Sequence, residues 1–321
     1  MATDSAQSAP APAPWRDLFL EHVSGMPSPE FVLSTVRRIP TPSPPLSGDG
    51  SGSSTKYAYV PRARTCVFRG FWAELPANPK NEAPRNPAGV YGSDLPTFTT
   101  DVRMAKVEEL WGYGEEEDEE EDGGGRREGT GGGASVEAVW WCAHGPKTQW
   151  RVRGEAYVLA PGDVEGEGGR EVVGRLRARM RRLDGKGEED GSKGVGEGEG
   201  EGEGEKEWSF AREITAHFGN QSPTMRGSFR NPPPGVPVGR WRPVDGDGLG
   251  LGQKVTDLRD KVARANFRVV VIVPREVDRC DLSDPDRARR WLYTFVGAGG
   301  RDGGKGKGER EGEWEVVEVW P

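Results

Sequence analysis

The sequence DLPTFTTDVRMAKVEEL, residues 94–110, joins a strand pattern to a helix pattern. Residues 96–100 are rich in Thr and Phe and bounded by turn residues, which predicts a strand. Residues 105–110 carry apolar side chains three positions apart, which predicts a short helix. Backbone N–H groups at such a junction are free to bind an anion. Because two hydroxyls and two cations share the stretch, it indicates a phosphate-binding turn; the alternative is a solvated basic turn.

Composition limits how much of the 321-residue chain folds. Only 33% of the residues are hydrophobic, and 48 Gly and 26 Pro are concentrated in a few tracts. Without those tracts about 200 residues remain, enough for one ordinary core. We therefore expect a disordered Ala/Pro/Ser tail over residues 1–13 and a single domain over residues 14–321. Low-complexity inserts interrupt that domain at about residues 114–133, 163–207 and 297–312.

Charge and cysteine usage exclude several classes of protein. The formal net charge of −8 comes mostly from the acidic runs, and nothing in it indicates a nucleic-acid binder. Cys66, Cys142 and Cys280 lie far apart without CxxC spacing, which argues against a disulfide framework and against a zinc site. The sequence shows neither a signal-peptide pattern nor a segment as long as a membrane span. We expect a soluble cytoplasmic protein that uses no metal and no membrane.

Strand patterns dominate the rest of the chain. Residues 14–22 predict an amphipathic helix, because Trp15, Leu18 and Phe19 share one face. Shorter helix patterns follow at residues 208–218 and 221–229. Apolar or alternating runs predict strands at residues 31–39, 63–72, 96–100, 135–142, 148–159, 266–274, 287–295 and 314–320. About eight strands that avoid open edges indicate a small β-barrel.

Three segments in this order resemble the pyridoxamine 5′-phosphate oxidase superfamily: ARTCVFRGF (63–71), LPTFTTDVRMAKVEEL (95–110) and TQWRVRGEAY (148–157). The opening APWRDLF and the later FRVVVIVPREVDRCDL and RRWLYTF are similar to that family's FMN-binding, oxidase-like branch. The resemblance implies a mainly β fold, an FMN-binding split β-barrel with a few short peripheral helices and long disordered acidic and Gly-rich inserts. It also implies a homodimer with FMN at the subunit interface.

The resemblance implies a phosphate site made of three cations. Arg64 would pair with the FMN phosphate, and Arg103 and Lys106 would clamp it. The residue types suit this role, because arginine binds phosphate in a bidentate manner and lysine acts as a point charge. The family's turn usually carries a serine just before the lysine. Met104 and Ala105 stand there in this chain, which removes a hydroxyl donor.

The same resemblance assigns the flavin ring. Val67 and Phe68 would line the isoalloxazine, and Thr99 and Thr100 would place backbone and hydroxyl donors near it. Gln149 is similar to the glutamine that reaches the flavin ring or the ribityl chain. A flavin needs an apolar slot and a few donors at its pyrimidine edge, so these residue types fit the role.

Three further residues are candidates for substrate contact. Arg69 matches the basic position that meets a substrate phosphate in the true oxidases, and Arg226 and Ser228 fall near the family's substrate loop. Edge-strand solubility is the alternative role for Arg64 and Arg69. The chain ends in VEVWP, without the Arg and His that grip the pyridoxal ring in the true oxidases, which makes oxidation of pyridoxamine phosphate doubtful.

The sequence therefore predicts an FMN-dependent oxidoreductase of the pyridoxamine-phosphate-oxidase-like type with a small-molecule substrate that it leaves unidentified. No Ser/His/Asp, Cys/His or paired-carboxylate pattern marks a catalytic residue. The alternative is a non-catalytic flavin-binding or dimerising split-barrel module whose acidic inserts mediate interactions.

Overall fold

The computed structural model describes residues 11–41, 57–112, 128–183, 207–240, 249–298 and 308–321. The helices in these ranges are α1 (Arg16–Ser24), α2 (Lys106–Trp111), α3 (Glu167–Arg177), α4 (Phe210–Gly219), α5 (Pro223–Ser228) and α6 (Lys261–Asn266). The strands are β1 (Glu30–Pro40), β2 (Tyr57–Val67), β3 (Tyr91–Ser93), β4 (Thr97–Asp101), β5 (Gly131–Cys142), β6 (Thr148–Leu159), β7 (Met180–Arg182), β8 (Phe267–Asp281), β9 (Arg289–Phe295), β10 (Glu309–Glu311) and β11 (Trp314–Val319). None of these helices is long and apolar enough to cross a membrane.

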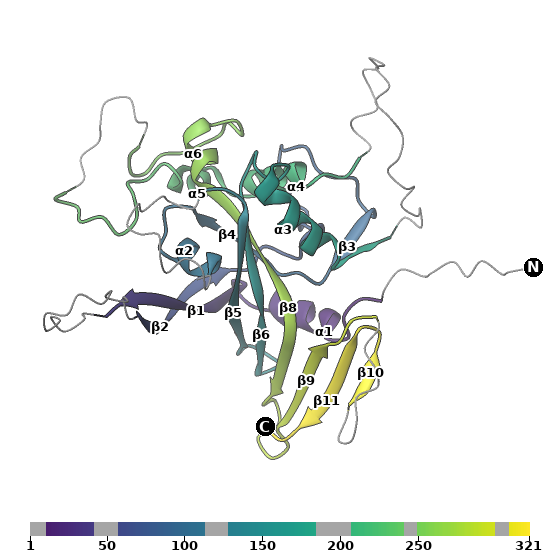
Figure 1. Cartoon of the computed structure of the whole chain (residues 1–321). Helices are drawn as coiled ribbons and strands as arrows, with labels where there is room; N and C mark the ends of the chain where they lie inside the picture. Colours follow the sequence, from purple (N-terminus) through teal and green to yellow (C-terminus); the bar gives the residue numbers. More distant parts are fainter. Residues whose placement is uncertain (1–10, 42–56, 113–127, 184–206, 241–248, 299–307) are drawn as a thin grey trace, which may run out of the picture.

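Six strands close into an antiparallel barrel (Figure 1). β1 pairs with β2 and β5, β6 pairs with β5 and β8, and β8 pairs with β4. The chain just beyond β2 then bonds to β4. The Arg69 N–H donates to the Thr97 carbonyl at 2.8 Å, and the Thr97 N–H donates to the Gly70 carbonyl at 2.9 Å. The ring is thereby complete and leaves no open edge inside the barrel.

β8 belongs to two sheets, and this splits the barrel. Its first residues pair with β4, whereas its last residues pair with β9, which continues through β11 to β10. A bulge between Arg153 and Gly154 of β6 faces Pro274 in the middle of β8. A Cβ on Gly154 would lie 2.0 Å from the Val273 carbonyl oxygen, so only glycine fits there.

Aromatic side chains fill the barrel, and α1 closes one of its ends. Trp15, which directly precedes α1, and Phe19 of α1 are fully buried. The Phe19 ring lies 5.0 Å from that of Trp140 and 5.6 Å from that of Trp150, centroid to centroid, with both pairs edge to face. The predicted amphipathic helix is confirmed, with its apolar face turned into the barrel.

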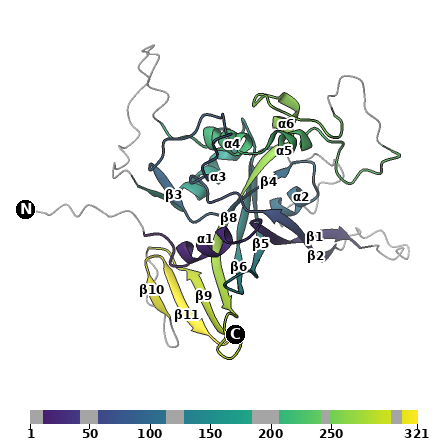
Figure 2. The ribbon, with the colours of Figure 1, turned by 180° about the vertical axis from the view of Figure 1, so that it is seen from behind.

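A second core lies between the outside of the barrel and the helices gathered at one end of it (Figure 2). Val269 and Val271 of β8 face this core together with Leu176 of α3 and Ile214 of α4. Val270 and Ile272, which alternate with them, face the barrel interior. Because both faces of β8 are buried, its sequence is a continuous apolar run, which explains why it is the most hydrophobic strand of the chain.

The fold class is mainly β, as predicted, but the bounds of the three inserts and of the tail differ. The predicted insert 163–207 contains α3 and β7, because Val172 and Leu176 reach the second core. The predicted insert 114–133 overlaps the start of β5, and the insert 297–312 contains β10. Ala13 of the predicted tail is buried, and its N–H donates to Asp94. The remaining parts of the tail and the inserts lie largely outside the described residues.

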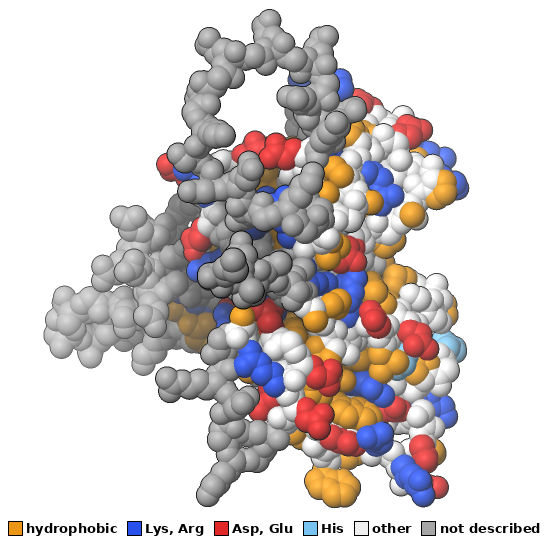
Figure 3. Space-filling model, turned by 90° about the vertical axis from the view of Figure 1, so that its right-hand side faces the viewer, with side chains coloured by type: hydrophobic (Ala, Val, Ile, Leu, Met, Phe, Trp, Pro, Cys, Tyr) orange, Lys and Arg blue, Asp and Glu red, His pale blue; other side chains and the backbone are white. Residues whose placement is uncertain are grey.

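The surface near the C-terminal strands is mixed in charge. On the side seen in Figure 3, Lys and Arg side chains lie among Asp and Glu side chains and hydrophobic ones. Across β9 and β11, the Arg289 Nε donates to Glu318 at 2.7 Å. Positive and negative side chains are therefore mixed on this side of the molecule, without a patch of one charge.

Candidate functional site

Lys106 and Thr100 come together at the predicted phosphate-binding turn. Lys106 begins α2, and its Nζ donates to Thr100 Oγ1 at 3.1 Å and to Met104 Sδ at 2.8 Å. Burial lowers the pKa of Lys106, an effect opposed by Cys66, Asp101 and Glu109. Within the described part of the chain, no ion pair neutralises this ammonium. A half-buried cation with only neutral partners suits an anionic ligand.

Arg64 approaches the same helix from β2. Its Nη1 donates to Thr35 Oγ1 at 2.5 Å, and its Nη2 forms an ion pair with Glu109 of α2. The Thr35 hydroxyl donates to the same Glu109 oxygen at 2.5 Å. The Glu109 side chain is 2% exposed and that of Arg64 22%, so Glu109 holds Arg64 from the protein side. α2 thus carries both Lys106 and the carboxylate that orients Arg64.

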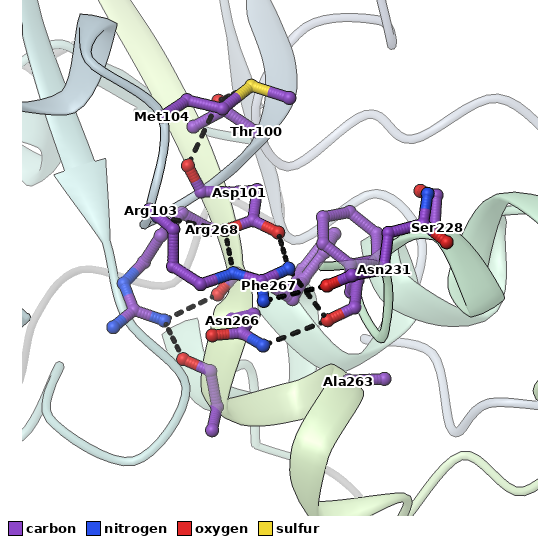
Figure 4. Close-up of polar contacts among 12 residues, drawn as sticks. Thr100, Asp101, Arg103, Met104, Ser228, Asn231, Ala263, Asn266, Phe267 and Arg268 are labelled. Atoms are coloured by element: carbon purple, nitrogen blue, oxygen red, sulfur yellow. Dashed lines mark hydrogen bonds and ion pairs between the residues drawn. The ribbon is translucent and has the colours of Figure 1, made fainter. Parts of the chain in front are cut away.

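Arg103 is held by protein groups (Figure 4). Its Nε and Nη2 donate to the two Asp101 oxygens at 2.9 and 2.6 Å. Its remaining contacts are with the carbonyls of Asn231, at 2.9 Å, and Phe229, at 3.2 Å. Both charged side chains of the pair are 5% exposed. Arg103 therefore presents no open guanidinium to a phosphate, which corrects its predicted role as a clamp, and it joins the turn after β4 to the segment after α5.

We expect Arg103→Ala to destabilise the protein without a specific effect on ligand affinity. The substitution leaves Asp101 buried and unpaired, which costs about 3–5 kcal/mol in comparable pairs. Urea unfolding measures the loss. Titration of FMN into the folded fraction at low temperature is expected to give the wild-type dissociation constant. A large loss of FMN affinity in protein that remains folded would restore the clamp role.

The predicted flavin-ring residues do not all face one place. Phe68 is 8% exposed and belongs to the barrel core, whereas Val67, its neighbour, faces outward. Thr100 lies on the Phe98 side of β4, and Thr99 lies on the opposite face, because strand side chains alternate. Gln149 pairs with the exposed Trp141.

Val67 and Gln149 lie in one row across the outer face of the barrel. Val67 pairs with Glu30 of β1, and Gln149 pairs with Trp141 of β5. Extending the β1–β5 register by two residues from the Val32–Val139 pair aligns Glu30 with Trp141. Three inter-strand spacings correspond to about 14 Å. Two strands, β1 and β5, therefore lie between Val67 and Gln149 on the barrel surface.

The three predicted substrate residues also separate. Arg69 and Phe68 line a cavity of about 590 Å³ beside α1. Arg226 is buried, and its Nε and Nη1 donate to the carbonyls of Val255 and Gly219. The Ser228 hydroxyl donates to the Met225 carbonyl at 2.7 Å. Arg226 therefore braces α5, which corrects its predicted contact with a substrate, while Arg69 remains beside a cavity.

Sequence reasoning missed Glu109 and Thr35. Both lie at positions that alone indicate an ordinary helix surface and an ordinary strand. Their role follows from packing of α2 against β1 and β2, which brings residues 74 positions apart within hydrogen-bond distance. The one local signal is the spacing of Lys106 and Glu109, three residues apart on a helix.

Comparison with known proteins gives one family match, which lies in the N-terminal part of the chain. Residues 12–160 match the family model "Pyridoxamine 5′-phosphate oxidase, FMN-binding domain". No curated protein matches the sequence. One similar solved structure is a pyridoxamine 5′-phosphate oxidase-related, FMN-binding protein from Nostoc punctiforme, with 17% identity, a TM-score of 0.48 and coverage of 97% of this chain and 100% of that one. Another is PhzG from Burkholderia lata in complex with tetrahydrophenazine-1-carboxylic acid, with 12% identity, a TM-score of 0.35 and coverage of 95% and 88%.

Proposed function

We propose that this chain, whose residues 12–160 carry a pyridoxamine 5′-phosphate oxidase-type FMN-binding domain, is a flavin-dependent oxidoreductase acting on a small molecule. The observation that carries the proposal is Lys106. Its ammonium is half-buried, bonds to a hydroxyl and a thioether, and lies on the same helix as the carboxylate that orients Arg64. Burying a cation with neutral partners is unfavourable unless an anion such as a phosphate binds it.

The residues at this site fit the phosphate end of FMN. Lys106 would supply a point charge, Thr100 a hydroxyl, and Arg64 the guanidinium N–H groups that Thr35 and Glu109 do not use. Glu109 would keep Arg64 in one orientation before binding, which lowers the entropic cost of association. When bound, FMN supplies the hydride chemistry, and the protein positions it and tunes its electronics.

We propose a homodimer, because the contacts for the ring are divided across the barrel. Val67 and Gln149 are separated by β1 and β5, which favours a flavin site that residues of a second subunit complete. The outer face of the barrel also exposes large apolar side chains. Val32 and Val36 of β1 are 41% and 46% exposed, and Trp141 of β5 is 46% exposed. Such side chains are common at the centre of protein interfaces.

Trp141→Glu is expected to dissociate the dimer. A charge at the centre of an apolar interface remains desolvated and unpaired, which is expected to weaken association by about 100-fold or more. Sedimentation velocity across a concentration series measures the change. Trp320→Glu is the matched control, since Trp320 is 92% exposed near the end of the chain. If Trp141→Glu remains a dimer at the lowest concentrations, the interface lies elsewhere.

The visible absorption spectrum of the purified protein, with the released cofactor identified by mass, tests the flavin proposal. About one FMN per subunit is the expected result. A colourless protein that also fails to bind added FMN would refute it.

A non-catalytic flavin module is the second candidate, favoured by the structural role of Arg226. The two candidates differ in whether the bound flavin turns over. Anaerobic mixing with candidate reduced substrates, beginning with pyridoxamine 5′-phosphate, followed by readmission of oxygen, separates them. Bleaching of the flavin absorbance and its return support the oxidoreductase. A flavin that no candidate reduces favours the binding module.

A further inference from the structure

Arg264 of α6 is a half-buried cation without a counter-charge. Its Nη2 donates to the Thr215 hydroxyl of α4 at 3.1 Å, and its guanidinium lies 5.5 Å from the centre of the Phe218 ring. Its Nη1 is buried and has no hydrogen-bond partner in the described structure. No ion pair to Arg264 occurs among the described residues.

Some arginines at comparable depth are matched with carboxylates, whereas the buried Arg226 and Arg268 donate to backbone carbonyls. The guanidinium groups of Arg16, Arg64, Arg103, Arg151 and Arg181 all form ion pairs with Asp or Glu. Even Arg230, whose segment lies close to α6, pairs with Asp260 at 3.0 Å. Arg264 differs from these in that one of its terminal guanidinium nitrogens, Nη1, has neither a carboxylate nor a carbonyl partner in the described structure.

The Arg264 side chain lines a cavity of about 730 Å³. Two further cations, Arg259 and Lys261, lie on its wall, and Glu82 is the carboxylate that lines it, which leaves an excess of two positive charges. Thr215 adds a hydroxyl. The rest of the wall is largely apolar, with Pro84, Pro161 and Leu258. A volume of this size is typical of small-molecule sites.

We propose that this cavity, named the α4–α6 cleft, binds a small phosphorylated molecule. Arg264 would bind the phosphate through charge-assisted hydrogen bonds, with Lys261 and Arg259 as further cations, while the proline and leucine side chains would contact an apolar body. The cleft shares no residue with the Lys106 site and lies between α4, α6 and the loops at residues 82–84 and 161–162. It is a second anion site, independent of the proposed flavin site.

Phenyl phosphate is a suitable probe, because it joins a phosphate to an apolar ring. Isothermal titration of the full chain, with and without one equivalent of FMN, is expected to show binding with a Kd of about 1 mM or tighter. FMN is expected to leave that binding unchanged. If one equivalent of FMN abolishes it, the probe occupies the flavin site and the proposal fails.

Arg264→Gln is expected to weaken phenyl phosphate binding at least tenfold, and Lys261→Gln several-fold. Arg240→Gln, an exposed charge outside the cleft, is the matched control and is expected to bind normally. Equal binding by Arg264→Gln and the wild type would overturn the assignment. If Arg264→Gln does not fold, Lys261→Gln serves in its place, because Lys261 is exposed. Unchanged phenyl phosphate binding by Lys261→Gln would then overturn the assignment.

Thermal unfolding distinguishes a ligand-binding Arg264 from a structural one. Removing an unpaired half-buried charge is expected to leave the Tm of Arg264→Gln equal to or above that of the wild type without ligand. Phenyl phosphate is expected to raise the Tm of the wild type and not that of the variant. A lower Tm in Arg264→Gln together with an unchanged response to the probe would show that Arg264 is structural.

Discussion

Replacing both Lys106 and Arg64 with alanine is expected to abolish retention of FMN through gel filtration while the protein still folds as a dimer. Charged hydrogen bonds of this kind contribute about 1.5–3 kcal/mol each, so each single substitution is expected to weaken FMN binding by about 10–100-fold. In the proposed site the two side chains would act on one phosphate from different elements, β2 and α2. If their effects add, the double variant loses about 1,000-fold in affinity, although neighbouring residues often deviate from additivity.

Arg64→Ala is also expected to lower the stability of the fold, and this effect has to be measured separately from the loss of FMN affinity. It leaves the buried Glu109 with Thr35 as its remaining described hydrogen-bond donor. Glu109→Gln in the Arg64→Ala background removes the stranded charge and is expected to restore stability without restoring FMN binding. Lys254→Ala, at an exposed lysine, is the matched control for Lys106→Ala. Stoichiometric FMN in the double variant would show that the phosphate site lies elsewhere.

The parts of this site that are predictable from sequence are the local ones. The strand and helix around residues 97–111 follow from short-range patterns, and β4 and α2 form within one residue of the expected bounds. Lys106 and Thr100 are close because a turn of a few residues joins them. The position of Arg64 beside this turn was expected from the family resemblance alone, since no spacing in the sequence indicates it.

The role of Arg103 was not predictable, because its partners are distant in sequence. The carbonyls of Phe229 and Asn231 lie 126 and 128 residues along the chain. A basic residue beside a phosphate-binding turn gives no sign of such acceptors. Short strands escape detection for a related reason, since β3 and β7 are three residues each and are defined by pairing with each other.

A line of buried polar groups follows one face of α4 and continues just beyond its C-terminal end. Glu213 and His217 of α4 and Gln221 after it are spaced four residues apart, and each has a buried side-chain atom with no hydrogen-bond partner in the described structure. His217 is fully buried and lies against the Trp72 ring, with 5.8 Å between centroids and 13° between planes. At the end of a helix a histidine cation is ordinarily favoured by the helix dipole. Burial of His217 in the second core instead disfavours its charged form.

Burial, reinforced by the charge of Arg69, lowers the pKa of His217 to about 3 from an ordinary value of 6.5. In the unfolded chain the imidazole takes up a proton as the pH falls below about 6.5, whereas in the folded protein it stays neutral until about pH 3. The contribution of neutral His217 to the free energy of unfolding is therefore fully present above pH 6.5, and it is lost as the pH falls from there toward 3. Glu213 has the opposite effect on stability. Burial raises its pKa, so its carboxylate becomes protonated as the pH falls, and the folded protein loses a buried charge.

His217→Phe is expected to make the free energy of unfolding depend less on pH below about pH 6.5. Phenylalanine keeps the stacking on Trp72 and removes both unpartnered ring nitrogens, so stability at pH 7 is expected to equal or exceed that of the wild type. Between pH 7 and pH 4 the wild type is expected to lose about 3 kcal/mol more than the variant.

Urea unfolding at several pH values measures this difference, with His144→Gln, at an exposed turn position, as the control. Comparing the wild type with His217→Phe cancels the contribution of Glu213, since both proteins contain it, provided that its own pKa is unchanged. Glu213→Gln in each background tests that condition. Parallel pH profiles for the wild type and His217→Phe would mean that water reaches the imidazole and that a charged His217 is tolerated inside the second core. The unpartnered side-chain atoms of this line would then be bonded to internal water, and they would not make the protein sensitive to acid.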